Sequence, residues 1–428
     1  MIIKNIRIID PASDLDQIGD IVIKDGRIAS LGAICNEASE ANVDDLDDSI
    51  IDGTGLVAAP GLVDVHVHFR DPGFEYKEDI YTGAAAAAKG GFTSVVMMAN
   101  TKPAIDNPET LKYVTDKGAQ TPINVYACGD ITIGLKGEIL TNMEELHNLG
   151  AVGFTDDGIP IKNPKLVKSA MMEAARLGVP LSFHEEDPTF ISENGINADV
   201  AAPHFGIKGS PRQAEISLID RDLKIAEDIP AEIVIQHISS AEGVELVRQA
   251  RATNSHVHAE VTPHHFTLTE EAVIKHETLA KMNPPLRTEA DRQALIRGLQ
   301  DDTIEIISTD HAPHSAEEKS KPLTEAPSGI IGLETSLGLG IRELVRTGLL
   351  PLNKLIEKMS LNPAKLYGLD AGRLYVGGPA DLCIFAVDEA WEVTGDYASK
   401  STNSPFTGET LYGKIHMTIV GGTMVYEG

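Results

Sequence analysis

Cysteine, basic residues and long apolar runs are scarce in this sequence. Its three cysteines among 428 residues, Cys35, Cys128 and Cys383, are too few and too widely spaced for a disulfide framework or a cysteine zinc site. No stretch approaches the roughly 20 consecutive apolar residues that span a bilayer, and residues 1–16 carry charges where a signal peptide would need an apolar run. We therefore expect a cytoplasmic protein in a reducing compartment.

The charge balance is strongly acidic. There are 36 Lys and Arg against 64 Asp and Glu, a formal net charge of −28, which repels nucleic acid and anionic membrane surfaces. We expect neither as a partner, and an anionic substrate would need local cations. With 42% hydrophobic and 23% charged residues, the composition is that of a globular protein with one large core and a smaller one.

Both ends of the chain show patterns of short strands with little helical periodicity. The expected strands are 2–9, 21–24, 27–31, 381–387, 414–420 and 423–426. Asp25-Gly26 favours a type I′ hairpin turn between two of them. Because each tail is too short for a stable sandwich by itself, we predict that residues 1–55 and 370–428 form one composite β-sandwich domain.

The middle of the chain, residues 56–369, alternates apolar runs of strand length with helical stretches such as the one containing Ala84–Ala88. The runs are 62–69, 93–99, 123–127, 151–154, 180–183, 231–235, 256–261 and 303–307. Eight such units predict an α/β fold, a (β/α)8 TIM barrel. An open doubly wound sheet is the alternative, but no glycine-rich phosphate loop follows the first strand. Lys319–Gly329, after the last strand, has the composition of an active-site lid.

The first barrel strand carries the strongest local signal. With a period of two, the polar residues Asp64, His66, His68 and Arg70 share one face, and the apolar residues between them share the face that packs on helices. Two imidazoles at i and i+2 can bind one metal ion. A lone His-x-His is weak evidence for a metal site, because such histidines can also be surface residues or hydrogen-bonded core residues. At the end of a buried apolar run, that second explanation becomes the poorer one.

Other predicted strands end in potential ligands as well. These are the adjacent Asp156 and Asp157, then His184, His237 and Asp310. His184 or His237 alone would be better explained as a hydrogen-bonded core histidine. Four histidines and two aspartates at the same end of different strands supply enough ligands for two metal ions, so we predict a binuclear site.

Several motifs carry a resemblance to a known family. They are Pro60–Asp64, His66–Gly73, Lys281–Arg287, Thr309–His314 and Gly332–Thr335. In order and spacing they resemble the signatures of bacterial class I dihydroorotases of the amidohydrolase superfamily. The resemblance spans nearly the whole chain and implies reversible cyclisation of N-carbamoyl-L-aspartate to L-dihydroorotate in de novo pyrimidine biosynthesis.

The resemblance also implies a role for each matching position. For two divalent metal ions, expected to be zinc, it assigns His66 and His68 to the first, His184 and His237 to the second, Asp157 to both, and Asp310 to the first and to acid and base catalysis. Asp156 is the fallback for the bridging position. For substrate it assigns His68, Arg70, Asn100, Asn283, His314, Ser328 and Gly329. Family members more often carry an aromatic residue at the position of Ser328.

General chemistry agrees with these roles. A hydroxide bridging two divalent ions is nucleophilic near neutral pH, and the ions polarise the carbonyl that it attacks. Asp310 beside the hydroxide could accept its proton and pass it to the leaving nitrogen. Arg70 offers a planar cation to a substrate carboxylate, which dihydroorotate has and dihydrouracil lacks.

Two alternatives remain at this point. Hydantoinases, dihydropyrimidinases and allantoinases resemble the chain, but they typically bridge their metals with a carboxylated lysine where Asp156 and Asp157 stand. A non-catalytic scaffold relative would usually show a broken ligand set. We expect a homodimer acting on a small molecule, and we interpret the remaining histidines, His204, His256, His258, His264 and His265, as core or supporting residues.

Overall fold

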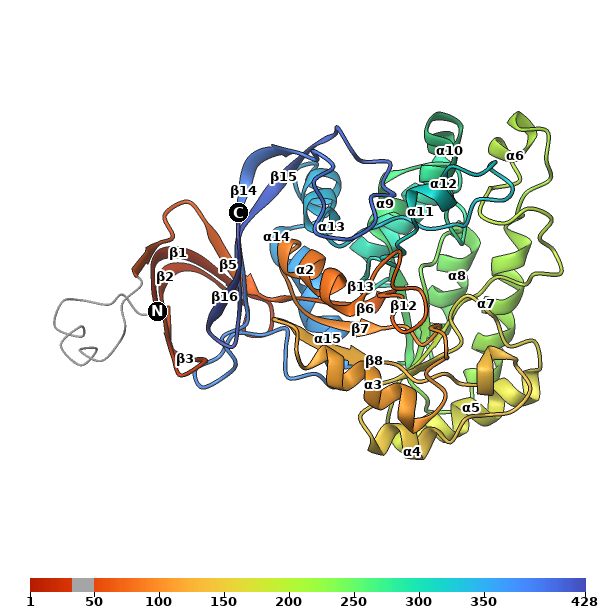
Figure 1. Cartoon of the computed structure of the whole chain (residues 1–428), viewed down its shortest axis with the longest axis horizontal. Coiled ribbons are helices and arrows are strands. Elements are labelled where there is room, and N and C mark those ends of the chain that lie inside the picture. Colours follow the sequence, from red (N-terminus) through yellow and green to blue (C-terminus); the bar gives the residue numbers. More distant parts are fainter. Residues whose placement is uncertain (33–49) are drawn as a thin grey trace.

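The computed structural model describes residues 1–32 and 50–428 and shows two parts. A curved β-sheet lies at one side of the molecule, and a larger body of helices around short strands forms the rest (Figure 1). No helix within the described ranges combines the length and the apolar character that crossing a membrane requires.

The larger part is a barrel. Within the described residues its strands are β6 (Leu62–Val67), β7 (Phe92–Met97), β8 (Asn124–Ala127), β9 (Phe154–Thr155), β10 (Leu181–Phe183), β11 (Ile233–Ile235), β12 (Val257–Val261) and β13 (Ile306–Ile307). They pair in parallel in the orders β6-β7-β8 and β9-β10-β11-β12-β13. Parallel bridges Val67–His311 and Gly129–Phe154 join the two sets into a closed ring. The predicted (β/α)8 fold is confirmed, although most strands are shorter than their apolar runs.

Helices surround this ring. They are α2 (Ile80–Lys89), α3 (Pro108–Gly118), α4 (Met143–Asn148), α5 (Pro164–Leu177), α7 (Gln213–Ala226), α8 (Ala241–Arg251), α11 (Glu289–Gln300), α13 (Ser336–Gly340), α14 (Leu352–Ile356) and α15 (Asn362–Leu366). Shorter helices, α6 (Ala201–His204), α9 (Pro263–Thr267), α10 (Glu271–His276) and α12 (Ala316–Lys319), lie in the connections. The small residues of α2 pack closely, as expected: Ala84 and Ala86–Ala88 are buried, and a Cβ atom at Gly83 would collide with the Phe69 ring.

The predicted alternation along the first barrel strand is wrong in one respect. Val63 and Val65 do not face the helices with Val67 and Phe69; they share a buried cluster with Val96, Met98 and Cys128. The pairing of β6 with β7 shifts register between Asp64 and Val67. A bulge of this kind reverses the side-chain alternation, so His66 and His68 face inward beyond an apolar layer.

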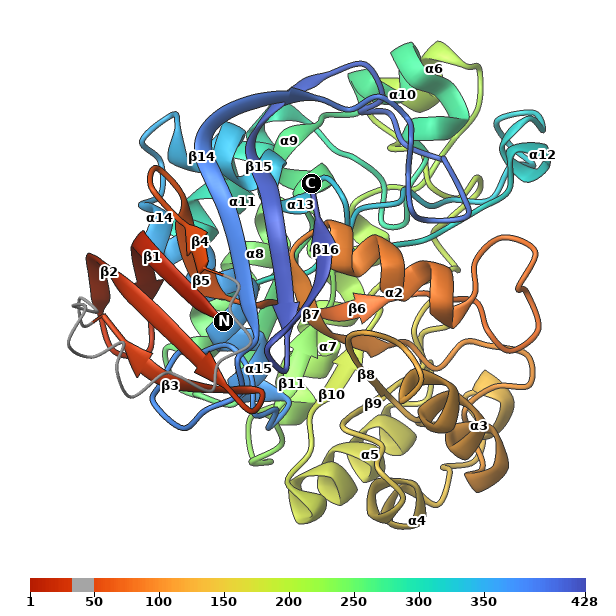
Figure 2. The same ribbon diagram turned by 60° about the vertical axis from the view of Figure 1, so that its left-hand side comes forward.

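The smaller part joins both ends of the chain in one sheet. Its strands are β1 (Ile2–Asp10), β2 (Leu15–Lys24), β3 (Arg27–Leu31), β4 (Ile50–Asp52), β5 (Val57–Pro60), β14 (Leu382–Glu392), β15 (Thr410–Val420) and β16 (Thr423–Glu427). The order is β16-β15-β14-β5-β1-β2-β3, with β4 beside β1 (Figure 2). Asp25 and Gly26 both have positive φ, as the expected type I′ turn requires.

Successive side chains of this sheet pack in two different hydrophobic cores. On β14, Leu382 and Ile384 pack with the isoleucines of β1 and β2, whereas Cys383 and Phe385 pack in the large cluster that includes α2. Because successive side chains point to opposite faces, one face encloses a small core and the other attaches the sheet to the barrel. The limits 1–55 with 370–428, and 56–369, stay a prediction; strand β5 (Val57–Pro60) lies in this sheet just beyond the first of these limits.

The connection between β14 and β15 reaches from the sheet across the barrel (Figures 1 and 2). Ser401 Oγ donates a 2.6 Å hydrogen bond to the carbonyl oxygen of Lys77, and Asn403 Nδ2 donates one of 3.0 Å to that of Ala312. Both partners belong to loops that follow barrel strands. The carboxyl-terminal part of the chain therefore supports the end of the barrel where the predicted site lies.

Candidate active site

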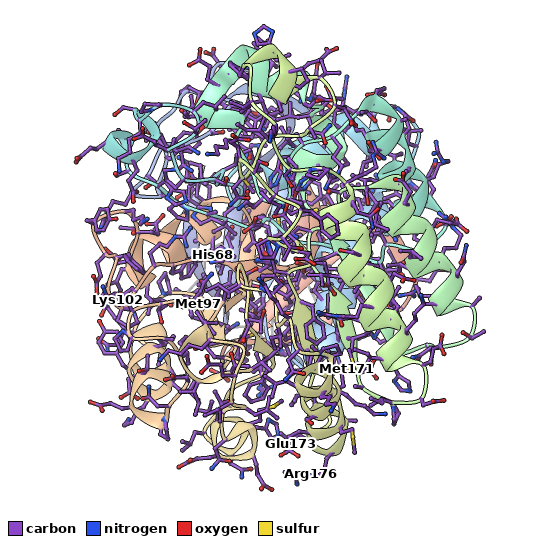
Figure 3. The ribbon with its side chains drawn as sticks, turned by 90° about the vertical axis from the view of Figure 1, so that its right-hand side faces the viewer. His68, Met97, Lys102, Met171, Glu173 and Arg176 are labelled. Carbon is purple, nitrogen blue, oxygen red and sulfur yellow. The ribbon has the colours of Figure 1, made fainter. Side chains whose placement is uncertain are left out.

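The six predicted ligands lie at the carboxyl ends of five barrel strands. His66 is on β6 and His68 just beyond it; Asp157, His184, His237 and Asp310 follow β9, β10, β11 and β13. In Figure 3, His68 lies well inside the molecule, whereas Glu173 and Arg176 of α5 lie at its edge. Parallel strands bring their carboxyl ends to one face of a barrel, so residues spread over 245 positions of the chain meet there.

Their donor atoms form three overlapping groups. In each group the atoms lie within 4.8 Å of one another: His66, His68 and Asp157; His66, His237 and Asp310; and Asp157, His184 and His237. All six residues are buried. Imidazole nitrogens and carboxylate oxygens within this distance suit borderline divalent cations, so the donor set fits the binding of divalent metal.

Asp157 is central to this cluster and Asp156 is not. Carboxylate oxygens of Asp157 lie 3.5 Å from His66 Nε2, 3.4 Å from His68 Nε2, 3.7 Å from His184 Nδ1 and 3.9 Å from His237 Nε2. Asp156 points the other way, where its carboxylate accepts hydrogen bonds from the backbone amides of residues 131 and 132. Of the two adjacent carboxylates, Asp157 alone has the position of a bridge.

Three residues of the cluster and its rim adopt strained backbone. Arg70, His237 and Asp310 have φ values of 60°, 32° and 46°. Side chains other than glycine rarely adopt positive φ, and each instance costs of order 1–3 kcal/mol. Such strain persists only where the surrounding structure imposes it. In these three residues, the unusual backbone conformation directs the side chain into the site.

Electrostatics in the cluster favour bound positive charge. Burial would lower the pKa of His66 and of His184, but the adjacent carboxylates raise the first well above its ordinary value and the second to about 10. The same histidines hold the pKa of Asp157 well below its ordinary value against the effect of burial. An excess of buried carboxylate thus draws protons onto imidazoles, and a divalent cation would supply the same charge while displacing them.

Sequence reasoning missed two carboxylates that support the ligands. Glu260 of β12 lies with Oε1 2.5 Å from His66 Nδ1, and Glu186 Oε2 lies 3.2 Å from His184 Nε2. Such partners orient an imidazole and select which nitrogen is free for a metal. His66 Nε2 is buried and has no hydrogen-bond partner in the described ranges. The available signal for Glu260 was an acidic residue within the apolar run 256–261.

The predicted substrate residues surround the ligands. Asn100 connects two of them, because its Oδ1 lies 3.0 Å from His68 Nδ1 and its Nδ2 donates a 3.0 Å hydrogen bond to Asp157. Asn283 and Ser328 lie near each other against Gly195. Asn283 Oδ1 and Ser328 Oγ are buried and find no hydrogen-bond partner among residues 1–32 and 50–428.

Cations gather on one side of this site despite the acidic composition. Arg70 is half-buried, and its guanidinium donates a 3.3 Å hydrogen bond to the carbonyl oxygen of Pro313. Its charge, with those of Lys77 and Lys319, acts on His314. Because the chain as a whole is strongly acidic, an anionic substrate group would depend on these cations for its binding.

The segment 319–329 covers His314 and is held by two lysines. His314 Nε2 donates a 2.8 Å hydrogen bond to the carbonyl oxygen of Ser328. Lys281 Nζ donates two bonds of 2.7 Å to backbone carbonyls of this segment, and Lys319 Nζ donates two more of 2.9 and 3.0 Å. Movement of the segment as a lid stays a prediction.

Comparison with known proteins agrees with the fold and the motifs. A family model described as dihydro-orotase-like matches residues 55–243. Over the full length of both chains, the sequence is 51% identical to a dihydroorotase of Clostridioides difficile and 48% identical to one of Streptococcus pneumoniae.

Solved structures extend the likeness to other cyclic amidohydrolases. An L-hydantoinase (dihydropyrimidinase) from Arthrobacter aurescens matches with a TM-score of 0.86 and 27% identity over 100% of this chain and 96% of its own. A dihydropyrimidinase from Brevibacillus agri has the same fold at 21% identity, with a TM-score of 0.85, covering 100% of this chain and 95% of its own. The identities to dihydroorotases are about twice as high and extend from end to end. The chain therefore belongs to the dihydroorotase family.

Proposed function

We propose that this enzyme, a cyclic-amide hydrolase by family, catalyses the reversible cyclisation of N-carbamoyl-L-aspartate to L-dihydroorotate in pyrimidine biosynthesis. The observation that carries the proposal is the cluster of His66, His68, Asp157, His184, His237 and Asp310 with Arg70 at its rim. The cluster suits amide hydrolysis, and Arg70 suits a ring that bears a carboxylate.

The proposed metal sites share one carboxylate. His66, His68 and Asp310 would hold one divalent cation, His184 and His237 a second, and Asp157 both, with zinc expected from the ligand types. When bound, two such ions lower the pKa of a water molecule and polarise the carbonyl under attack.

In the proposed reaction, Asp310 transfers a proton. Asp310 Oδ1 lies 3.0 Å from His68 Nε2 and 3.5 Å from His66 Nε2, so it borders the space that the reacting water would enter. In ring opening, the water oxygen bonds to the amide carbonyl carbon and the ring C–N bond breaks. Asp310 accepts the proton of the water and delivers it to the departing nitrogen; ring closure follows the same path in reverse.

Substrate selection is the first test. Purified, metal-analysed protein is assayed for ring opening of L-dihydroorotate, dihydrouracil, hydantoin and allantoin. We expect turnover of dihydroorotate alone. Activity only on the uncharged rings would reassign the chain to the hydantoinase branch, and no turnover despite bound metal would indicate a scaffold.

Arg70→Met tests the recognition of the substrate carboxylate. Loss of one bidentate hydrogen-bonded ion pair between Arg70 and the carboxylate should raise KM for dihydroorotate about 100-fold. Arg176→Met on α5, whose side chain is half exposed and pairs with Glu173 at the edge of the molecule, is the matched control and should leave KM unchanged. An unaltered KM in Arg70→Met would remove Arg70 from the binding site.

Glu260→Gln tests the support of His66. The substitution keeps the shape but removes the carboxylate that lies 2.5 Å from His66 Nδ1, so metal affinity should fall about 10- to 100-fold. Competition with a chromophoric chelator measures that affinity without reference to turnover. Glu232→Gln, which alters a carboxylate paired with His256 and His258 near the opposite ends of the strands, should bind metal as the unaltered chain does.

The expected homodimer also remains a proposal. Light scattering of the purified chain at several concentrations tests it directly.

A further inference from the structure

A second cluster of ionisable side chains adjoins the proposed substrate site. Lys77 Nζ lies 3.3 Å from His314 Nδ1 and donates a 2.8 Å hydrogen bond to Glu318 Oε1. Tyr76 OH donates a 2.9 Å bond to the same oxygen. Lys77 and His314 are buried. The ligand set and the mechanism leave Lys77 and Glu318 without a role.

The partners of His314 determine where its proton lies. An ammonium group only donates hydrogen bonds, so His314 Nδ1 must accept from Lys77. A carbonyl oxygen only accepts, so Nε2 must carry the proton that is donated to Ser328. A doubly protonated ring would place an N–H group against the ammonium of Lys77. The neutral Nε2–H tautomer is the form that satisfies both contacts.

Charges around His314 favour the same neutral form. Burial lowers the pKa of His314 to about 2, assisted by Arg70, Lys77 and Lys319, while Glu318 opposes them. Other titratable groups facing the ring are Tyr76, beside Glu318, and Lys275, His276 and Glu277, which line the adjoining cavity of about 560 Å³. Glu318 is the nearest carboxylate, with Oε2 3.5 Å from His314 Nδ1.

We propose that Lys77 is a positioning residue that holds His314 as a neutral Nε2–H donor, whose hydrogen bond passes from the Ser328 carbonyl oxygen to the carboxylate of a bound substrate. This inference rests on the proposed function of His314 in substrate binding. Arg70 supplies the charge for the carboxylate, and His314 adds a directed hydrogen bond whose direction Lys77 sets. Glu318 places the ammonium group of Lys77 and is itself held by the Ser315 backbone amide at 2.9 Å.

Lys77→Met should release this constraint. The variant removes the donor to Nδ1 and leaves the Glu318 carboxylate as the nearest charge, so the pKa of His314 should rise and the ring should exchange between tautomers. In Lys77→Met/Glu318→Gln the attracting carboxylate is also gone. The double variant should therefore lose the rise in pKa while keeping the tautomer exchange.

Nitrogen NMR of ¹⁵N-histidine-labelled holoenzyme reads the tautomer directly, with His314→Asn to assign the signals. We expect one protonated Nε2 and one unprotonated Nδ1 that persist from about pH 6 to about pH 9, and an averaged or protonated ring in Lys77→Met. A protonated Nδ1 in the unaltered protein, or the same ring state in both proteins, would overturn the proposal.

Kinetics provide the second readout. In Lys77→Met, KM for dihydroorotate should rise about tenfold near pH 8 and vary with pH, with kcat within about twofold. Lys400→Met is the matched control, because Lys400, in the connection between β14 and β15, pairs with Asp79 at 2.5 Å, two residues along the chain from Lys77; it should keep the KM of the unaltered chain. An equal loss of kcat in Lys77→Met would indicate a merely structural role and overturn the proposal.

The two readouts separate this inference from the proposed function. If the unaltered chain fails to turn over dihydroorotate, the proposed function fails, and the NMR result still decides whether Lys77 sets the tautomer of His314. If turnover is normal and the tautomer is insensitive to Lys77, this inference alone fails.

Discussion

Asp310→Asn is expected to abolish ring opening and ring closure together. An amide cannot take the proton from water, and a positioned acid or base contributes on the order of 10² to 10⁴ in rate. We expect kcat for dihydroorotate to fall about 1,000-fold in both directions. The measurement is steady-state turnover of dihydroorotate and of N-carbamoyl-L-aspartate, with metal content determined on the same samples.

Asp130→Asn is the matched control for this prediction. Asp130 follows β8 as Asp310 follows β13, and both its oxygens are buried and lack a partner within the described parts of the chain. Burial and the neighbouring Asp156 raise its pKa to about 10, so it is already a neutral acid near pH 7. Its amide variant should retain full activity. Retained activity in Asp310→Asn would contradict the assigned role.

Asp157→Asn is expected to have the second large effect, on metal content. This carboxylate lies within 3.9 Å of four imidazoles from three strands, and an amide cannot supply two anionic oxygens to two cations. We expect metal content to fall from about two ions per chain to one or fewer, and kcat to fall at least about 100-fold. Metal analysis after gel filtration measures the first and turnover the second.

Asp156→Asn controls for the neighbouring carboxylate. Asp156 accepts hydrogen bonds of 2.8 and 2.9 Å from two backbone amides and one from the Thr132 hydroxyl, so it braces the loop after β8. An amide oxygen can still accept part of this set, so stability should drop by about 1–2 kcal/mol with metal content unchanged. Metal loss in Asp156→Asn but not in Asp157→Asn would reverse the two assignments.

Much of the fold could be predicted because its signals are local. Each apolar run of the barrel overlaps a strand, since a strand buried on both sides must be continuously apolar. Asp25-Gly26 turns where predicted because few dipeptides adopt two successive positive φ values. Strand ends were predicted less well: β9 is only Phe154–Thr155 and β13 only Ile306–Ile307, because pairing across the barrel decides how far a strand extends.

The bulge in β6 shows where local pattern fails. The period of two predicted that Val63 and Val65 lie on the same face as Val67, but the register shift reverses the alternation between them. Nothing in the residues themselves marks the shift, because valine suits either face. It arises where the strand must pair with β7 and still present His66 and His68 inward.

The choice of Asp157 over Asp156 came from the resemblance to dihydroorotases. By itself, the sequence determined the barrel, the joining of both ends in one β domain and the gathering of potential ligands at the strand ends. These follow from periodicity and from the rule that parallel strands end together. Only the tertiary structure decided that Glu260 meets His66, 194 residues away, and that Lys77 meets His314, 237 residues away. The physical reason is that a hydrogen bond between side chains depends on positions within a few tenths of an ångström, which packing sets and residue spacing does not.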